Sequence, residues 1–160
     1  MALFDPEFSR CALCAGQFAA DERPFATSDG LDFGRYGDTV FHWECVAQWS
    51  EREAFARAIF ESERESVSGN EFWTIVFDDD AVLVSVNPEL GEPRADVCLA
   101  ETGSIFEVPI EAWKRWLRGE GGPEVQHASE IEPLNRARAR LAAMLPTSEA
   151  LLAGVRRASP

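Results

Sequence analysis

Four residues in the first third of the chain have the types and the spacing of metal ligands. Cys11 and Cys14 form a C-x2-C pair within RCALCAG, and His42 and Cys45 form an H-x2-C pair within VFHWECV. Thiolate sulfur and imidazole nitrogen are preferred donors to Zn²⁺, and four such ligands close a tetrahedral structural site. Because the members of each pair are separated by two residues, one turn of backbone can aim both donors at the same ion. The spacing predicts one Cys3His zinc site per chain.

Four protein ligands predict a structural ion, because a catalytic zinc keeps one position for water. A competing interpretation uses Glu44, since His42-Trp43-Glu44 reads as the H-x-E motif of zinc deaminases, in which the glutamate shuttles protons. In those enzymes a P-C-x-x-C motif follows H-x-E. Here the C-x2-C pair precedes it and has no proline, and Cys45 would fill the fourth position. We therefore expect no catalytic residue in this segment.

The residues between the two pairs predict a small hairpin that covers the ion. Gly16 directly follows the first pair and could take the positive φ of a zinc knuckle. Asp29-Gly30 is a turn signal, so a hairpin is expected over residues 17–41. A module of this size needs aromatic bulk to bury its ligands, and we expect that bulk from three phenylalanines of the insert, Phe18, Phe25 and Phe33.

The second ligand pair begins a helix. His42 and Cys45 are three residues apart at the start of an apolar-periodic stretch, which places both on one face of the first turn. The helical pattern continues to about residue 64, with a kink near residues 49–50, where a capping box begins at Ser50. A knuckle, a hairpin-length insert and a ligand-bearing helix start resemble the treble-clef zinc finger, and the ligand types and their order resemble the first half of a LIM domain. The resemblance covers residues 8–65 and implies the module's fold and its four ligands, but no partner.

The remainder of the chain predicts a sheet and further helices. Runs of β-branched and aromatic residues predict a four-stranded antiparallel meander, at 71–77, 81–87, 95–101 and 104–110. Trp113 and Trp116 share one face of a helix expected over 111–119 and should lie across the sheet. A glycine-rich linker over 119–130 precedes a helix at 134–145, and a last helix is expected to be capped by Thr147 or Ser148.

These patterns together predict an α+β fold in three parts. The parts are a treble-clef zinc module with its following helix, an antiparallel β-meander with a packed helix, and a linker with C-terminal helices, at residues 1–66, 67–120 and 121–160. The C-terminal helices are expected to dock on their own domain or on a second copy of the chain.

Charge and composition exclude several classes of function. The chain has 160 residues with 28 acidic and 15 basic side chains, a net charge of −13, so nucleic-acid phosphates would repel it. We expect neither a secretory signal nor a membrane span, because the sequence has no basic start followed by an apolar run and no stretch of about 18 apolar residues. With three of the four cysteines assigned to the metal, no disulfide framework is possible, which favours a reducing, cytoplasmic location.

By elimination and charge, the sequence predicts a non-enzymatic, zinc-stabilised acidic protein-interaction module. A bacterial-type immunity or inhibitor protein that masks the basic site of a nucleic-acid-acting partner would fit this description. Two acidic clusters are the expected contact surfaces, with Phe33 and Trp73 as aromatic anchors: Asp29, Asp32 and Asp38 in the insert, and Asp78, Asp79 and Asp80 at a hairpin tip. The alternative is an enzyme or regulator with a pocket in the meander domain and a purely structural zinc.

Two further residues with reactive side chains have simpler interpretations. His127 lies in the glycine-rich linker, where a solvated side chain is expected. Cys98 lies in a predicted strand without a histidine nearby in sequence, so we expect a small buried side chain rather than a nucleophile.

Overall fold

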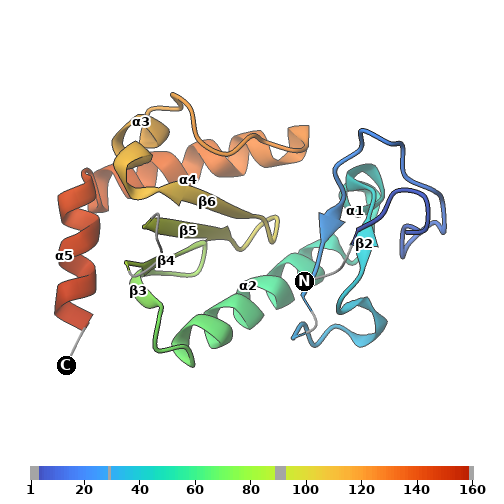
Figure 1. Cartoon of the computed structure of the whole chain (residues 1–160), viewed down its shortest axis with the longest axis horizontal. Helices are drawn as coiled ribbons and strands as arrows, with labels where there is room; N and C mark the ends of the chain where they lie inside the picture. Colours follow the sequence, from blue (N-terminus) through green and yellow to red (C-terminus); the bar gives the residue numbers. More distant parts are fainter. Residues whose placement is uncertain (1–3, 29, 89–92, 159–160) are drawn as a thin grey trace.

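The helices and strands follow the predicted order and confirm an α+β fold (Figure 1). The computed structural model describes residues 4–28, 30–88 and 93–158. They contain a two-stranded sheet, β1 and β2, and a four-stranded antiparallel sheet with the strand order β3-β4-β5-β6. The small sheet lies at one end of the molecule and the larger sheet toward the other, and helix α2 runs between them (Figure 1).

The N-terminal part is a short hairpin followed by a short helix. Strand β1 (Phe25–Ala26) pairs antiparallel with β2 (Val40–Phe41), and the 3-10 turn η1 (Gly34–Tyr36) lies between them. Helix α1 (Trp43–Gln48) begins directly after β2, with His42 as its N-cap residue. A hairpin leading into a ligand-bearing helix is therefore present, although the turn residue Asp29 lies outside the described residues.

The helical structure is interrupted between α1 and α2 (Arg52–Ser68), as the sequence predicted. The expected capping box at Ser50 does not form, because the N-cap residue is Glu51, whose side chain makes no capping hydrogen bond. Aromatic packing holds the break instead: Trp49 has an extended backbone, and its ring packs against Phe55 with 5.2 Å between the centroids.

The four-stranded sheet is a simple meander. Its strands are β3 (Thr74–Asp78), β4 (Val82–Asn87), β5 (Arg94–Leu99) and β6 (Ile105–Pro109). The first strand begins three residues later than predicted, because Asn70 starts a turn in which its backbone carbonyl accepts from the N–H of Trp73 at 3.2 Å. Alternation places Val84, Val97 and Val108 in one core, on one face of the sheet.

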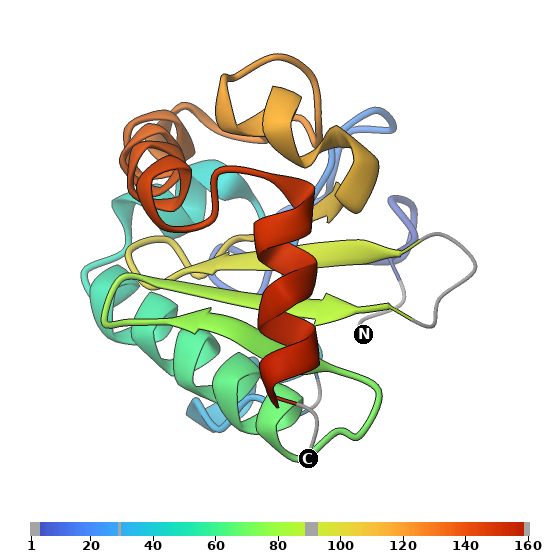
Figure 2. The same ribbon diagram turned by 90° about the vertical axis from the view of Figure 1, so that its left-hand side faces the viewer.

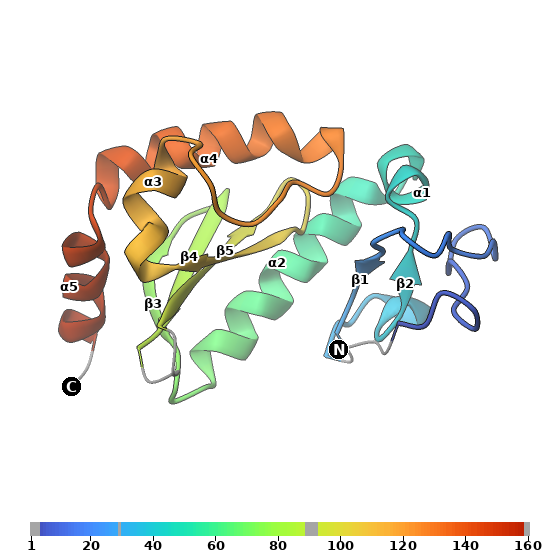
Figure 3. The same ribbon diagram turned by 45° about the horizontal axis from the view of Figure 1, so that its top comes forward.

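Three helices cover that face, on the side of the sheet opposite α2 (Figure 3). They are α3 (Trp113–Leu117), which continues the 3-10 turn η2 (Ile110–Ala112), and then α4 (Ile131–Met144) and α5 (Ser148–Ala158). Trp113 and Trp116 are fully buried there, and the indole N–H of Trp113 donates to the carbonyl of Leu145 at 2.7 Å. The predicted orientation of both tryptophans is confirmed.

The last two helices end and begin at the predicted signals. Helix α4 ends at Met144, before Pro146, and the Thr147 hydroxyl accepts from the N–H of Ala150 at 3.2 Å in the first turn of α5. Helix α5 then crosses the sheet (Figure 2). Gly154 contacts β3 so closely that an added Cβ would lie 2.9 Å from the Cβ of Val76.

Helix α2 contributes to two cores. Near its start, Phe55 belongs to the aromatic core of the N-terminal hairpin, whereas Phe60, farther along, packs with Leu83 and Cys98 on the other face of the sheet. Gly103, in the turn between β5 and β6, lies against the same helix with a φ of +70°, and a Cβ there would meet Ile59 Cδ1 at 2.9 Å. The division at residue 66 stays a prediction, but α2 spans that position and contributes to the cores beside both sheets.

The segment expected to be a flexible linker has specific contacts at its end. Glu130, in the 3-10 turn η3 (Ala128–Glu130), is 1% exposed, and its carboxylate accepts from the backbone N–H groups of Gln126 and His127 at 2.7 and 3.0 Å. Helix α4 starts three residues before the predicted position and takes Pro133 into its first turn, where proline is tolerated. Within the described parts of the chain, we find no helix with both the length and the apolar character needed to cross a bilayer.

Candidate metal centre

The four predicted ligands converge on one point. One donor atom from each of Cys11, Cys14, His42 and Cys45 lies within 4.8 Å of all the others. His42 Nδ1 is 3.3 Å from Cys14 Sγ and 3.8 Å from Cys45 Sγ. These separations suit a tetrahedral ion, because bond lengths of ~2.0–2.3 Å place neighbouring ligand atoms roughly 3.5–3.8 Å apart. The four residues are positioned to hold a metal ion.

The first ligand pair lies in a tight turn whose shape differs from the prediction in one respect. The positive φ is at Ala15, at +58°, and Gly16 does not have one. The N–H of Ala15 donates to the carbonyl of Cys11 at 2.8 Å, and the N–H of Gly16 points at Cys14 Sγ, 3.3 Å away. Position 16 is crowded, because an added Cβ would lie 3.2 Å from both Cys14 Sγ and His42 Cε1.

His42 is oriented by groups outside the ligand set. Its Nδ1 faces the sulfurs, and its Nε2 lies 3.1 Å from the backbone carbonyl of Gln17 and 3.8 Å from the carboxylate of Glu22. A proton on Nε2 leaves the Nδ1 lone pair free for a metal, the usual arrangement of a ligating histidine. Phe18 covers the imidazole, with ring centroids 4.3 Å apart. The predicted cover by Phe18 is therefore confirmed.

The other two predicted aromatic residues pack farther along the same core. The ring of Phe25 lies 4.8 Å from that of Trp43, and Phe33 packs against Trp49 and Phe55. The aromatic residues near the ligands are thus continuous with the aromatic core to which α2 contributes.

The thiols have opposite electrostatic environments. Burial raises the pKa of Cys11, but backbone N–H groups of Cys14, His42 and Leu13 lower it more, to about 7. Burial and the neighbouring sulfurs of Cys14 and Cys11 raise the pKa of Cys45 to about 12. Three thiolates at this separation repel one another unless a cation lies among them, so metal binding is expected to release protons.

Glu44 takes no part in the ligand group. Its carboxylate lies 3.2 Å from His127 Nε2, on an exposed side chain. Cys45 contributes the fourth donor instead, so the fourth position that a deaminase keeps for water is filled by a protein ligand. The catalytic interpretation of His42-Trp43-Glu44 gains no support from this geometry.

His127 corrects another expectation. It is mostly buried, with 17% of its side chain exposed, and its ring stacks parallel to that of Trp43 at 6.0 Å. Its Nδ1 also accepts from the N–H of Ser129 at 3.2 Å, and with Glu130 it forms a capping box at η3. The sequence signal was present, since His127-Ala-Ser-Glu130 has the spacing of a capping box, but the contact with Trp43 has no local signature.

The acidic hairpin tip is held by internal contacts. Asp78 accepts from Arg64 at 2.7 Å, and Asp79 pairs with Arg140 at the same distance. The other carboxylate oxygen of Asp79 accepts from two backbone N–H groups of the turn, at 2.8 and 2.9 Å. Asp80 is exposed. Two of the three tip carboxylates therefore make contacts within the fold. A partner that binds them would have to compete with these contacts.

The other proposed contact residues have varied surroundings. Asp29 lies outside the described residues, whereas Asp32 and Asp38 are exposed. Phe33 is packed in the aromatic core, and Trp73 is half-buried with the guanidinium of Arg94 over its ring, 5.6 Å from the centroid. Their contact with a partner stays a prediction.

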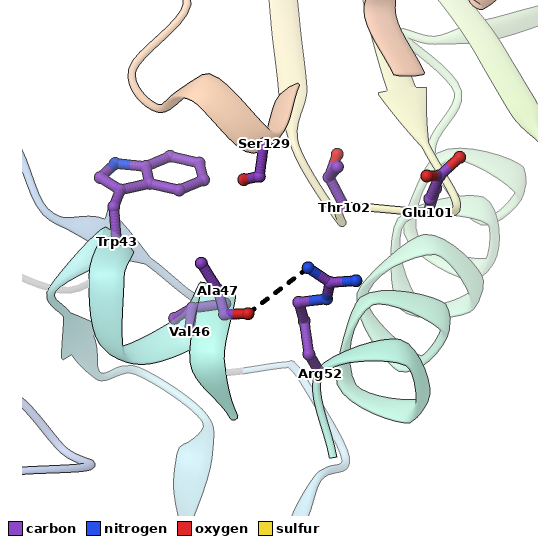
Figure 4. A pocket seen from close by; sticks show the side chains of 7 residues that line it. All are labelled: Trp43, Val46, Ala47, Arg52, Glu101, Thr102 and Ser129. Atoms are coloured by element: carbon purple, nitrogen blue, oxygen red, sulfur yellow. Dashed lines mark hydrogen bonds between the residues drawn. The ribbon is translucent and has the colours of Figure 1, made fainter. Parts of the chain in front are cut away.

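Two cavities border Trp43. The first is a crevice of about 30 Å³, the space of a single water molecule, between α1, the start of α2, the β5–β6 turn and η3 (Figure 4). There the benzene half of Trp43 points toward Ser129, and the guanidinium of Arg52 donates to the carbonyl of Ala47 at 3.4 Å. The second is an open cleft of about 400 Å³ between the chain around residues 21–23 and residues 124–127. Of the residues that line these two cavities, only Glu101 and Thr102 belong to the predicted meander domain, where the alternative function would require its pocket.

The sheet carries one unusual carboxyl group. Asp96, on β5, is 9% exposed, on the face of the sheet that also carries Cys98. Burial raises the pKa of Asp96 to about 7. The positive charge of Arg94 lowers this pKa, whereas the negative charges of Glu107 and Glu63 raise it further. Arg94 lies 3.4 Å away and also binds Glu107 at 2.8 Å, so one guanidinium serves two carboxylates.

Comparison of the chain with family models, curated proteins and solved structures finds no match. The metal centre and the surface around it are therefore the basis for assigning a function.

Proposed function

We propose that the protein is a non-enzymatic interaction module, stabilised by one structural Zn²⁺, that binds a basic partner protein. The observation that carries the proposal is the convergence of three thiol sulfurs and one imidazole nitrogen within 4.8 Å. This donor set, in this geometry, suits zinc better than the harder divalent ions. Since protein donors supply all four positions, the ion's role is to fix the hairpin and the start of α1.

The arrangement of elements supports the resemblance to a treble clef. A ligand-bearing turn, a hairpin and a ligand-bearing helix start follow one another in the expected order. Such a module is a common scaffold for binding, so the proposal places recognition on its surface rather than at the ion.

The charge of the chain supports a basic partner. The net charge is −13, and contact with a positively charged surface would be steered by that field. We propose that the chain is an immunity or inhibitor protein in a reducing compartment. Its partner would be a nucleic-acid-acting enzyme whose basic site it covers. The same charge disfavours direct contact with nucleic acid.

Affinity capture tests this proposal. The zinc-loaded chain is immobilised, a lysate of the native host is passed over it at low salt, and captured proteins are eluted by raising the salt. We expect a basic protein whose on-rate falls steeply with ionic strength. Purified protein without stoichiometric zinc, or capture of no basic protein at low salt, would contradict the proposal.

A further inference from the structure

The open cleft beside the metal centre combines acidic side chains with an aromatic surface. Four carboxylates and two rings contribute to its lining, namely those of Asp21, Glu22, Glu44, Glu124, Trp43 and His127. The one basic residue in its lining, Arg23, lies 3.5 Å from Glu124. The cleft therefore carries an excess of negative charge next to an aromatic pair, within a volume of about 400 Å³.

Both walls of the cleft are held by contacts outside it. On one side, the Glu22 carboxylate accepts from the N–H of Ala19 at 3.1 Å and lies near the ligand His42. On the other side, the buried carboxylate of Glu130 binds the backbone of Gln126 and His127. The His127–Glu44 contact then joins the two walls. A surface held in this way loses little conformational entropy when a ligand binds.

The distances between the cleft carboxylates distinguish a divalent metal ion from an organic cation as the group that could bind there. Among the described residues, the only group of three or more His, Cys, Asp or Glu side chains that converge on a point is the Cys3His group. No three of the cleft carboxylates therefore converge on one point, so the cleft lacks a three-ligand site for a divalent ion. Spaced carboxylates beside aromatic rings instead match a planar guanidinium, which pairs with carboxylates through several N–H donors and stacks on ring faces.

We propose that this cleft binds an arginine side chain of the partner protein. The inference rests on the proposed function and adds to it the location of the contact and the residue recognised. The exposed members of the acidic clusters predicted from sequence, Asp32, Asp38 and Asp80, then serve steering, and this cleft serves recognition.

The test uses the full zinc-loaded chain, labelled with ¹⁵N, and the blocked pentapeptide Gly-Arg-Gly-Arg-Gly. We expect the backbone signals of Gln126 and His127 and the indole signal of Trp43 to shift on titration. The matched peptide with lysine in place of arginine should bind several-fold more weakly, because an ammonium neither stacks nor forms paired hydrogen bonds. Equal affinity for the two peptides, or shifts confined to other surfaces, would overturn the inference.

A matched pair of variants separates the cleft from net charge. The cleft variant carries Asp21→Asn, Glu44→Gln and Glu124→Gln, and it spares Glu22 because that side chain approaches the ligand His42. The control variant removes three exposed charges elsewhere, with Glu65→Gln, Glu71→Gln and Glu111→Gln. We expect the cleft variant to bind the arginine peptide about tenfold more weakly than wild type, and the control to change by less than about twofold. Equal losses in the two variants would mean diffuse attraction and would overturn the inference.

The failure of this inference can be told apart from the failure of the proposed function. If the chain captures a basic protein from the lysate and the cleft variant captures it equally well, the cleft is not the contact and the proposed function stands. If neither the peptide nor any basic protein binds at low salt, both fail.

Discussion

Cys14 and Cys98 differ in environment more than any other pair of cysteines in the chain. Cys14 is exposed and lies in the ligand group, whereas Cys98 is fully buried in the core under α2. We expect Cys14→Ser to abolish stoichiometric zinc and to remove much of the ~10–16 kcal/mol that such an ion can contribute to folding of its module. Cys98→Ser should retain the zinc and cost about 1–3 kcal/mol, from a polar group placed in an apolar core. Metal analysis and thermal unfolding of both variants test this, and zinc retained by Cys14→Ser would contradict the ligand assignment.

The knuckle offers a second comparison between adjacent residues. Ala15 has a φ of +58°, so Ala15→Gly should stabilise the zinc-loaded chain by about 0.5–1 kcal/mol. Gly16→Ala should instead weaken zinc binding, because the new methyl group would lie 3.2 Å from Cys14 Sγ and His42 Cε1. Competition with a chelator measures the zinc affinity of each variant. A tighter site in Gly16→Ala than in wild type would show that the crowding is absent.

Asp96 predicts a pH dependence with a definite sign. Its pKa is raised from 3.8 to about 7, so the folded state holds a proton that the unfolded state has already released in this range. The stability that this proton provides is complete below about pH 4, is lost as pH rises toward 7, and amounts to a few kcal/mol, at roughly 1.4 kcal/mol per unit of pKa. Denaturant unfolding between pH 5 and 8 should show this decline in wild type and a flatter profile in Asp96→Asn. The comparison with the variant is necessary because zinc binding also depends on pH. Parallel profiles would contradict the assignment.

At the scale of elements, the sequence was most informative where a local pattern of residues determines the structure. Periodicity and ligand spacing predicted the two ligand pairs, the four strands and the burial of Trp113 and Trp116. Contacts between distant residues leave no such pattern, which is why the stacking of His127 on Trp43 and the pairing of Arg140 with Asp79 were missed. The same limit applies to the hairpin tip, where Asp78 and Asp79 look free in sequence but bind arginine side chains in the fold.

Helix α2 makes a prediction about cooperativity. The three-part division predicts that a chelator unfolds the zinc module and leaves the sheet intact. Because α2 places Phe55 in one core and Phe60 in the other, we expect instead that zinc removal loosens both. Hydrogen exchange of peptides from β4 and β5 should accelerate on chelation, and this can be followed by mass spectrometry. Full protection of those strands in the metal-free chain would contradict this expectation and support the division into independently folded modules.

At the scale of the whole molecule, the small sheet and α1, which carry the four metal-ligating residues or lie beside them, are at one end, and α5 is at the other (Figure 1). Within the described residues, the N-terminal part is connected to the rest of the fold by helix α2, by the contact of His127 with Trp43 and Glu44, and by the Arg23–Glu124 pair. A ligand at the cleft touches the second connection directly. Its binding is therefore expected to raise the thermal stability of the entire chain rather than of the zinc module alone.

The use of α2 by two cores also bears on how such a protein can arise. Zinc fingers that recur in many unrelated proteins can be moved between genes, because each buries its own hydrophobic residues. Here a cut after residue 66 would leave Phe60 without Leu83 and Cys98, and the cleft without the wall at residues 124–127. The metal-binding part and the sheet are thus expected to be inherited together, and a relative that keeps the four ligands without the sheet should lack the cleft.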